Sequence, residues 1–192
     1  PRTVPLVVTV HDLAVLHDAA SFTRRGTSFM RRAIEMTKER ADLVLCSSRA
    51  TLADCEANGF DADRLRFVPL GVAVEPASPS DIERVRAAYG LPDRYIVFVG
   101  TREPRKNLAG LLEAYRRLDR ADEVGLVLVG PEGWGDHGAG AAERGAEQGV
   151  QALGFVPHDD LPALYAGAAV SCYPSLLEGF GLPVLEAMAQ GT

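Results

Sequence analysis

Two glutamates near the end of the chain form the pattern that most strongly suggests chemistry. Glu178 and Glu186 are eight positions apart, in a segment that also contains Gly179, Gly181 and Pro183. The glycines allow a sharp turn and a close approach to a ligand, and the proline suits the first turn of a helix. The N–H groups at a helix start attract phosphate, whereas carboxylates only accept hydrogen bonds and suit hydroxyl groups. The pattern predicts a site for a ligand with phosphate and sugar hydroxyls.

Each glutamate also has an ordinary interpretation. Glu186, in the first turn of the helix expected after Pro183, would complement the helix dipole, and Glu178 would be a solvated loop residue. The apolar run 169–173 before the loop predicts a buried strand. The pattern therefore falls at a strand end, where parallel α/β sheets bind their ligands.

A basic loop forms a second candidate site. After Gly100, at the end of an apolar run, the loop contains Arg105 and Lys106 and leads into a helix expected to start at Asn107. Cations are unfavourable near a helix start, so we expect an anion, such as a nucleoside diphosphate, to balance them. A solvated basic loop is the alternative.

Strands and helices alternate along the chain, which predicts an α/β fold with a mostly parallel sheet covered on both faces. A capping box of Ser80 and Glu83 is expected to start one helix, which Gly90 ends. Strands are expected at 5–10, 42–46, 65–68, 95–99, 124–129, 150–153 and 169–173, and the other helices at 22–40, 49–57, 107–120 and 159–167.

Several blocks of the chain, in order, resemble the retaining glycosyltransferases of family 4, also called group 1 glycosyltransferases. The blocks are Glu178-x7-Glu186 around Gly-Phe-Gly-Leu-Pro, His11-Asp12, 41–48, 99–107, 128–131 and 153–157. The resemblance implies the GT-B architecture, with parts of two Rossmann-like parallel-sheet domains facing a cleft. Residues 1–70 would be the C-terminal part of the acceptor-side domain, 71–80 a linker, and 81–192 a donor-binding domain truncated at its C-terminus. The chain would thus be a central fragment.

The resemblance also implies roles for individual residues. The catalytic residues would be His11 beside the transferred sugar, Lys106 on the donor diphosphate and Glu178 on the sugar. Thr101 stands where many members have an arginine, so the second phosphate cation is expected to be Arg105 first and Arg102 second. The donor-binding residues implied are Gly100, Arg105, Lys106, Phe155, Val156, Glu178, Gly179, Phe180, Gly181, Leu182 and Glu186.

The implied activity is metal-independent transfer of a hexose, with retention, from a nucleotide-diphosphate sugar to an acceptor hydroxyl. The donor would be a GDP-, UDP-, ADP- or dTDP-sugar, and no further cofactor is expected. The acceptor would be a carbohydrate, a lipid-linked molecule or a small molecule, and a mannosyltransferase-like subgroup is indicated. The alternatives are a nucleotide-sugar epimerase or a glycogen-type synthase on the same fold, and a catalytically silent nucleotide-binding module.

Composition excludes other classes. A formal net charge of −6 and a pI near 5.2 disfavour a nucleic-acid surface, and no apolar run reaches the ~18 residues of a membrane span. We expect a cytoplasmic protein, with peripheral association at the inner membrane face through regions beyond this chain. Asp61-Ala-Asp63 is interpreted as a turn, and His17-Asp18 as part of a loop without metal. Free thiols in a reducing compartment are expected for Cys46, Cys55 and Cys172.

Overall fold

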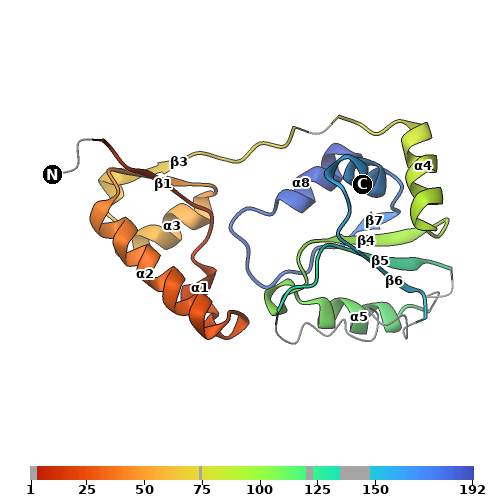
Figure 1. Ribbon diagram of the computed structural model, residues 1–192, viewed down its shortest axis with the longest axis horizontal. Coiled ribbons are helices and arrows are strands. Elements are labelled where there is room, and N and C mark those ends of the chain that lie inside the picture. Colours follow the sequence, from red (N-terminus) through yellow and green to blue (C-terminus); the bar gives the residue numbers. More distant parts are fainter. Residues whose placement is uncertain (1–3, 74, 120–122, 135–147) are drawn as a thin grey trace. The chain divides into compact units, whose positions relative to one another are not determined.

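The computed structural model describes residues 4–73, 75–119, 123–134 and 148–192 of the 192-residue chain (Figure 1). Contacts between Cα atoms divide the chain into two compact units. The first comprises Pro1–Gly71 together with Leu177–Gly181, and the second comprises Val72–Leu176 together with Leu182–Thr192. The short loop Leu177–Gly181 therefore belongs to the first unit, although its neighbours in sequence belong to the second.

A parallel sheet of three strands, in the spatial order β1-β2-β3, forms the centre of the first unit. Side-chain oxygens of Thr23 and Ser48 accept hydrogen bonds from the first turns of α2 and α3, which is why these helices begin there. The elements are β1 (Val7–Val10), α1 (Ala14–His17), α2 (Arg24–Arg40), β2 (Leu43–Cys46), α3 (Arg49–Ala57), β3 (Leu65–Phe67) and the 3₁₀ turns Ala19–Ser21 and Ala62–Arg64.

The second unit contains a parallel sheet of four strands in the order β6-β5-β4-β7. Its strands are β4 (Tyr95–Val99), β5 (Gly125–Val129), β6 (Val150–Gly154) and β7 (Val170–Ser171). Its helical segments are α4 (Pro79–Tyr89), α5 (Leu108–Arg116), α7 (Leu161–Ala166), α8 (Leu182–Ala189) and the 3₁₀ turns Pro104–Lys106 and His158–Asp160.

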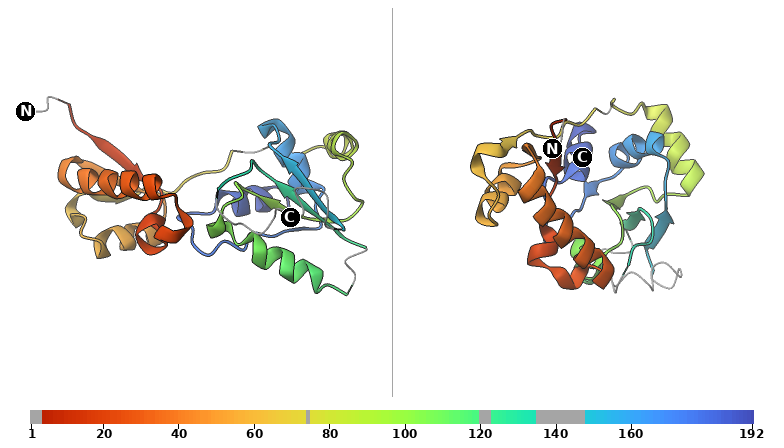
Figure 2. Two further views of the ribbon diagram at one scale, coloured as in Figure 1. Left: turned by 60° about the horizontal axis from the view of Figure 1, so that its bottom comes forward. Right: turned by 60° about the vertical axis from the view of Figure 1, so that its left-hand side comes forward.

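Both faces of this second sheet are buried, as expected. Along β4, Tyr95 and Val97 pack with residues of α4, α7 and α8, whereas Ile96 and Phe98 pack with residues of α5. Figure 2 shows the same layering, with α5 on one side of the sheet. Because all the strands run parallel, their carboxyl ends lie at one edge, where the loops after β4, β5 and β6 emerge.

The start of α4 differs from the sequence prediction. The capping box is formed by Ser78 and Asp81, not by Ser80 and Glu83, and Pro79 is the first helical residue. A proline suits the first helical position because its missing N–H group would have no partner there, and this choice moves the cap two residues earlier. The helix ends at Gly90 as predicted, with a left-handed φ of 59°.

Three other expectations fail, two of them near the glycine loop. Glu186 is the fifth residue of α8 and no acidic residue occupies the first turn, so the prediction of a first-turn position is wrong. The strand expected at 169–173 shortens to β7, because β4 pairs only with Val170 and Ser171. His17 is the last residue of α1 instead of a loop residue.

Other local predictions are confirmed. The Asp61 carboxylate accepts a hydrogen bond from the N–H group of Asp63 and starts the 3₁₀ turn Ala62–Arg64, so this segment is a turn. Cys46, Cys55 and Cys172 are free; the first two are buried, and the third is partly buried.

Candidate functional site

The basic loop after β4 is tied to the segment that follows β7. The Nζ atom of Lys106 donates to the hydroxyl of Tyr173 over 2.6 Å. The N–H group of Leu176 donates to the carbonyl of Arg105 over 2.9 Å, and the side chain of Asn107 donates to the carbonyl of Pro174 over 3.3 Å. These bonds join two segments that are far apart in the sequence, since 67 positions separate Lys106 from Tyr173. The first segment is the predicted basic loop, and the second directly precedes the loop that contains Glu178.

Lys106 is a buried cation of the basic loop. Only 7% of its surface is exposed, and its Nζ atom lies 4.9 Å from the centroid of the Tyr173 ring. That ring stacks in turn on Phe98 of β4, with 6.2 Å between centroids. Burial of a charged group costs free energy unless the group is paired or hydrogen-bonded. The structure therefore holds this ammonium at the carboxyl edge of the sheet by a hydrogen bond and a cation–π contact.

Arg105 has an anionic partner that sequence reasoning did not identify. Its Nη2 atom lies 2.7 Å from Oε1 of Glu103, and both side chains are largely buried. The expectation that a bound anion also balances Arg105 stays a prediction, to which the structure adds a carboxylate of the same loop as a partner. Arg102, the second candidate, is also buried, and its N–H group donates to the carbonyl of Pro131.

Glu186 is held by a tyrosine of the neighbouring helix. The hydroxyl of Tyr165, on α7, donates to Oε2 of Glu186, on α8, over 3.0 Å. Tyr165 is buried, and this burial, followed by the negative charge of Glu186, raises the pKa of the phenol. The phenol thus remains a hydrogen-bond donor at physiological pH.

The remaining candidates of the second unit differ in what they expose. After β6, the Phe155 side chain is 77% exposed, whereas the Val156 side chain is buried in the core. Leu182 is the first residue of α8. Gly100 follows β4, and its N–H group donates to the carbonyl of Val129. Its own carbonyl oxygen would be 2.1 Å from a Cβ at Gly130, so the loops after β4 and β5 pack closely only because Gly130 has no side chain.

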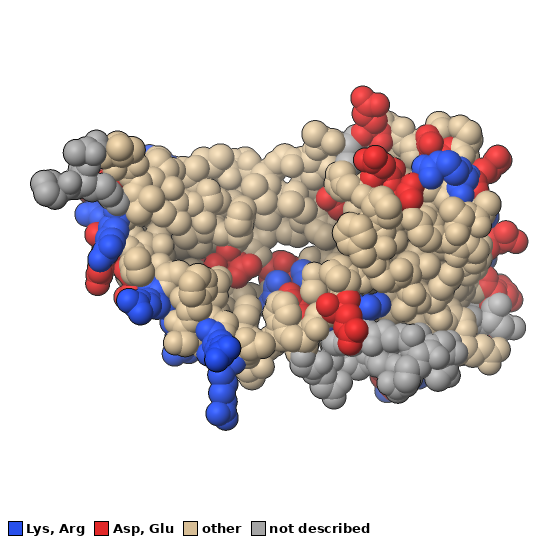
Figure 3. Space-filling view, viewed as in Figure 1, with Lys and Arg blue, Asp and Glu red and all other residues tan. Residues whose placement is uncertain are grey.

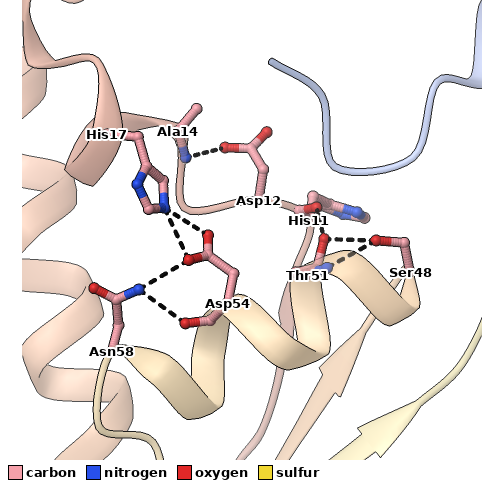
Figure 4. A network of polar contacts seen from close by, with 8 residues as sticks. All are labelled: His11, Asp12, Ala14, His17, Ser48, Thr51, Asp54 and Asn58. Atoms are coloured by element: carbon pink, nitrogen blue, oxygen red, sulfur yellow. Dashed lines mark hydrogen bonds and ion pairs between the residues drawn. The ribbon is translucent and has the colours of Figure 1, made fainter.

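His11 lies in the first unit, directly after β1, and it is exposed. Its carbonyl accepts hydrogen bonds from the hydroxyls of Ser47 and Thr51, each over 3.0 Å. The Asp12 carboxylate accepts from the N–H group of Ala14, the first residue of α1. Figure 4 shows Thr51 on α3 pointing toward the His11 backbone.

The loop Leu177–Gly181 packs against this turn. A Cβ atom placed on Gly179 would lie 1.8 Å from the carbonyl oxygen of His11, and the Thr51 hydroxyl is 3.3 Å from the carbonyl oxygen of Gly179. Gly181 has a φ of 87°, a left-handed conformation that favours glycine. Glu178 and Phe180, the other candidates of this loop, are partly buried.

A side-chain pair beside this loop was not predicted. Both carboxylate oxygens of Asp54 lie 2.8 Å from Nε2 of His17, and one of them accepts from the Asn58 side chain (Figure 4). The pair joins α1 to α3. A cavity of about 210 Å³ adjoins it, lined also by Asp12, Leu13, Ala14, Ala50, Thr51, Leu177, Glu178 and Gly179. Nothing in the sequence pattern marks this pair, because 37 positions separate its members.

Within residues 4–73, 75–119, 123–134 and 148–192, no three His, Cys, Asp or Glu side chains come together as metal ligands would. Over the same part of the chain, no helix has the length and apolar character needed to cross a membrane.

Comparisons with known proteins agree on one family. The model of the family "Glycosyl transferases group 1" matches residues 81–192, and the model of "Glycosyltransferase Family 4" matches residues 1–76. The O-antigen chain mannosyltransferase B of Escherichia coli is 35% identical over 96% of this chain and 51% of its own length. The D-inositol 3-phosphate glycosyltransferase of Mycobacterium tuberculosis is 32% identical over 98% of this chain and 41% of its own. The chain spans about half the length of the curated relatives it matches.

Solved structures show the same likeness. Anabaena HepE in complex with UDP and glucose superimposes with a TM-score of 0.78 and 25% identity, over 98% of this chain and 51% of that chain. WaaG, a glycosyltransferase involved in lipopolysaccharide biosynthesis, has a TM-score of 0.75 at 20% identity, over 96% of this chain and 54% of its own. These likenesses confirm the predicted α/β fold class of the GT-B type.

Proposed function

The chain belongs to the group 1 glycosyltransferases, and from that membership we propose that it transfers a hexose from a nucleotide-diphosphate sugar to an acceptor hydroxyl. The bond between the anomeric carbon and the phosphate oxygen breaks. The acceptor oxygen bonds to the same face of that carbon, and the leaving diphosphate takes the acceptor proton. Inverted configuration in the product, seen by NMR, would contradict this retaining course.

The observation that carries the proposal is the joining of the basic loop to the segment after β7. Three hydrogen bonds connect residues 105–107 with residues 173–176, directly before the Glu178 loop. A buried ammonium at the carboxyl edge of a parallel sheet is suited to a ligand diphosphate. Negative charge grows on that diphosphate as the glycosidic bond breaks, so Lys106 acts mainly in the transition state.

The other candidates have complementary roles in this proposal. Glu186 accepts from the ribose hydroxyls, Glu178 accepts from the sugar, and His11 approaches the transferred hexose. Backbone groups of Phe155 and Val156 contact the base, and N–H groups of the loop that ends at Leu182, including Gly181, contact the diphosphate. The second phosphate cation is proposed to be Arg105 or Arg102, and the proposal needs no metal or further cofactor.

The choice of donor and acceptor is also a proposal. The names of the relatives favour a mannosyl or glucosyl donor, because one is a mannosyltransferase and another is bound to UDP and glucose. GDP- and UDP-sugars are therefore the first donors to test, ahead of ADP- and dTDP-sugars. The acceptor is proposed to be a carbohydrate, a lipid-linked molecule or a small hydroxylated molecule.

Calorimetric titration with GDP, UDP, ADP and dTDP tests the donor site, with Glu186→Ala as the control variant. Binding of one nucleotide that the variant weakens would support the site and identify the donor base. A folded protein that binds none of the four would contradict it. Release of free nucleoside diphosphate only in the presence of an acceptor would separate a transferase from an epimerase.

We also propose that the protein is cytoplasmic and associates with an anionic membrane surface, and α2 supports this. Six of its seventeen residues are Lys or Arg and two are Glu, in a chain whose net charge is −6. Lys and Arg side chains gather over α2 in Figure 3, and Phe29 and Met36 of this helix are 72% and 42% exposed. A basic helix with exposed apolar residues suits anionic lipid headgroups.

Sedimentation with phosphatidylglycerol vesicles tests this association, with phosphatidylcholine vesicles as the comparison. The protein should bind the anionic vesicles, and Phe29→Ser should weaken that binding. Equal binding to both kinds of vesicle, or to neither, would contradict the proposal.

A further inference from the structure

Two buried tyrosines of the second unit donate hydrogen bonds from their hydroxyls, Tyr165 to a side chain of α8 and Tyr95 to a backbone carbonyl of α7, and the bond from Tyr165 reaches a residue of the proposed site. The Tyr165 hydroxyl donates to Oε2 of Glu186 over 3.0 Å. The Tyr95 hydroxyl donates to the carbonyl of Leu164 over 2.7 Å. Both tyrosines are 1% exposed and belong to one core cluster, so they are equally buried but have different hydrogen-bond partners.

The bond from Tyr165 restricts Glu186 strongly. A free glutamate on a helix has several rotatable bonds and samples many rotamers. The phenol is fixed by core packing and stays protonated, while the carboxylate is acceptor-only. Oε2 of Glu186 therefore accepts from the buried phenol, and the other carboxylate oxygen, Oε1, can accept from a ligand.

We propose that Tyr165 is a positioning residue that orients the Glu186 carboxylate toward the ribose hydroxyls of the donor nucleotide. The inference rests on the proposed function and deepens it, because it predicts selectivity for the sugar of the nucleotide. A site built to accept from a hydroxyl discriminates against an analogue that lacks it. A loosely held carboxylate can adapt to either ligand, so the discrimination depends on the restraint.

The test compares the binding of the ribonucleoside diphosphate that the protein takes with that of its 2′-deoxy analogue. Calorimetry measures both dissociation constants for the unmodified protein and for Tyr165→Phe, which keeps the ring in the core. The variant should bind the ribonucleotide up to about tenfold more weakly, since the ligand must then order a carboxylate that the protein no longer restrains. Binding of the 2′-deoxy analogue should change much less, so the ratio of the two constants falls.

Tyr95→Phe is the matched control. It removes from the same cluster a buried hydroxyl of β4, whose acceptor is the carbonyl of Leu164, the residue before Tyr165 on α7, and it leaves the bond to Glu186 intact. It should lower the melting temperature and leave both dissociation constants unchanged. A general loosening of the core would instead lower the affinity in both variants, and that result would overturn the proposal.

The double variant Tyr165→Phe with Glu186→Ala separates the inference from the proposed function. If Tyr165 acts through the carboxylate, the double variant binds no more weakly than Glu186→Ala alone. If the affinity losses of the two substitutions add in the double variant, the inference is overturned. It is also overturned if Tyr165→Phe binds the nucleotide as tightly as the unmodified protein while Glu186→Ala binds it more weakly. If Glu186→Ala itself leaves binding unchanged, both the proposed ribose contact and the inference are refuted.

Discussion

Gly179→Ala should abolish most of the proposed transferase activity without unfolding the protein. The Cβ atom of an alanine at this position would lie 1.8 Å from the carbonyl oxygen of His11, where real Cβ contacts are at least 3.0 Å. The two groups would therefore have to move apart by at least 1.2 Å (3.0 − 1.8) to make an ordinary contact. The His11 carbonyl cannot retreat easily, because the hydroxyls of Ser47 and Thr51 both donate to it. The loop that carries Glu178 must therefore move.

The expected loss is large because the shift occurs between two residues proposed to contact the sugar. A misplacement of about 1 Å can lower a rate by about 100-fold, so kcat/KM should fall by about that factor. Initial rates of nucleoside diphosphate release measure the loss. The assay uses whichever polypeptide shows transferase activity, either this chain alone or a longer polypeptide that contains it. The melting temperature should change little, because the loop lies outside the core clusters.

Gly71→Ala is the matched control for this substitution. A Cβ at Gly71 meets no atom within 4 Å, and its φ is outside the left-handed range, so activity should be unchanged. Full activity of Gly179→Ala would refute the reasoning, since it would mean that the loop and the His11 turn do not pack together in the working enzyme. Thr51→Val tests the same packing in a second way, because it removes the hydroxyl that lies against the His11 and Gly179 carbonyls. It should lower kcat/KM without adding a steric clash.

Three further predictions concern a cation, an ion pair and a thiol. Lys106→Ala removes a proposed donor to the leaving diphosphate and should lower kcat by about 100-fold, ~3 kcal/mol; an unchanged kcat would remove it from the mechanism. Asp54→Ala breaks the contact with His17 and should lower the free energy of unfolding by about 1 kcal/mol, measured in urea against Asp63→Ala on the exposed turn, which should have no effect. Burial raises the pKa of Cys55 from 9.0 to about 12, so the unfolded chain loses this proton first. The free energy of unfolding should therefore fall as pH rises from 9 to 12, and Cys55→Ala should show a smaller fall; an equal fall would contradict the assignment.

The fold class could be predicted from the sequence because its signals are local. Apolar runs at 95–99 and 124–129 and helix ends such as Gly90 depend on neighbours within a few residues, and the structure contains elements at these positions. The error at α4 was local too. Two overlapping capping patterns compete there, and Pro79 at the first helical position decides for Ser78.

The family could also be recognised from the sequence, because its pattern lies in contiguous segments. Glu178, Glu186 and the glycines between them are a single stretch of chain, and the family model matches residues 81–192. The roles of the candidate residues stay predictions, because they depend on a bound donor.

The partners of the site residues were decided only by the tertiary structure. Tyr165 is 21 positions from Glu186, and Lys106 is 67 positions from Tyr173. Such pairs meet because parallel strands bring their carboxyl ends, and the loops and helices after them, to one edge of the sheet. Even the nearby pair of Glu103 and Arg105 was not foreseen, since a carboxylate two positions away becomes a partner only when the loop folds back and buries both. The sequence by itself determined which residues could do the chemistry, and the packing of the sheet determined how each is held.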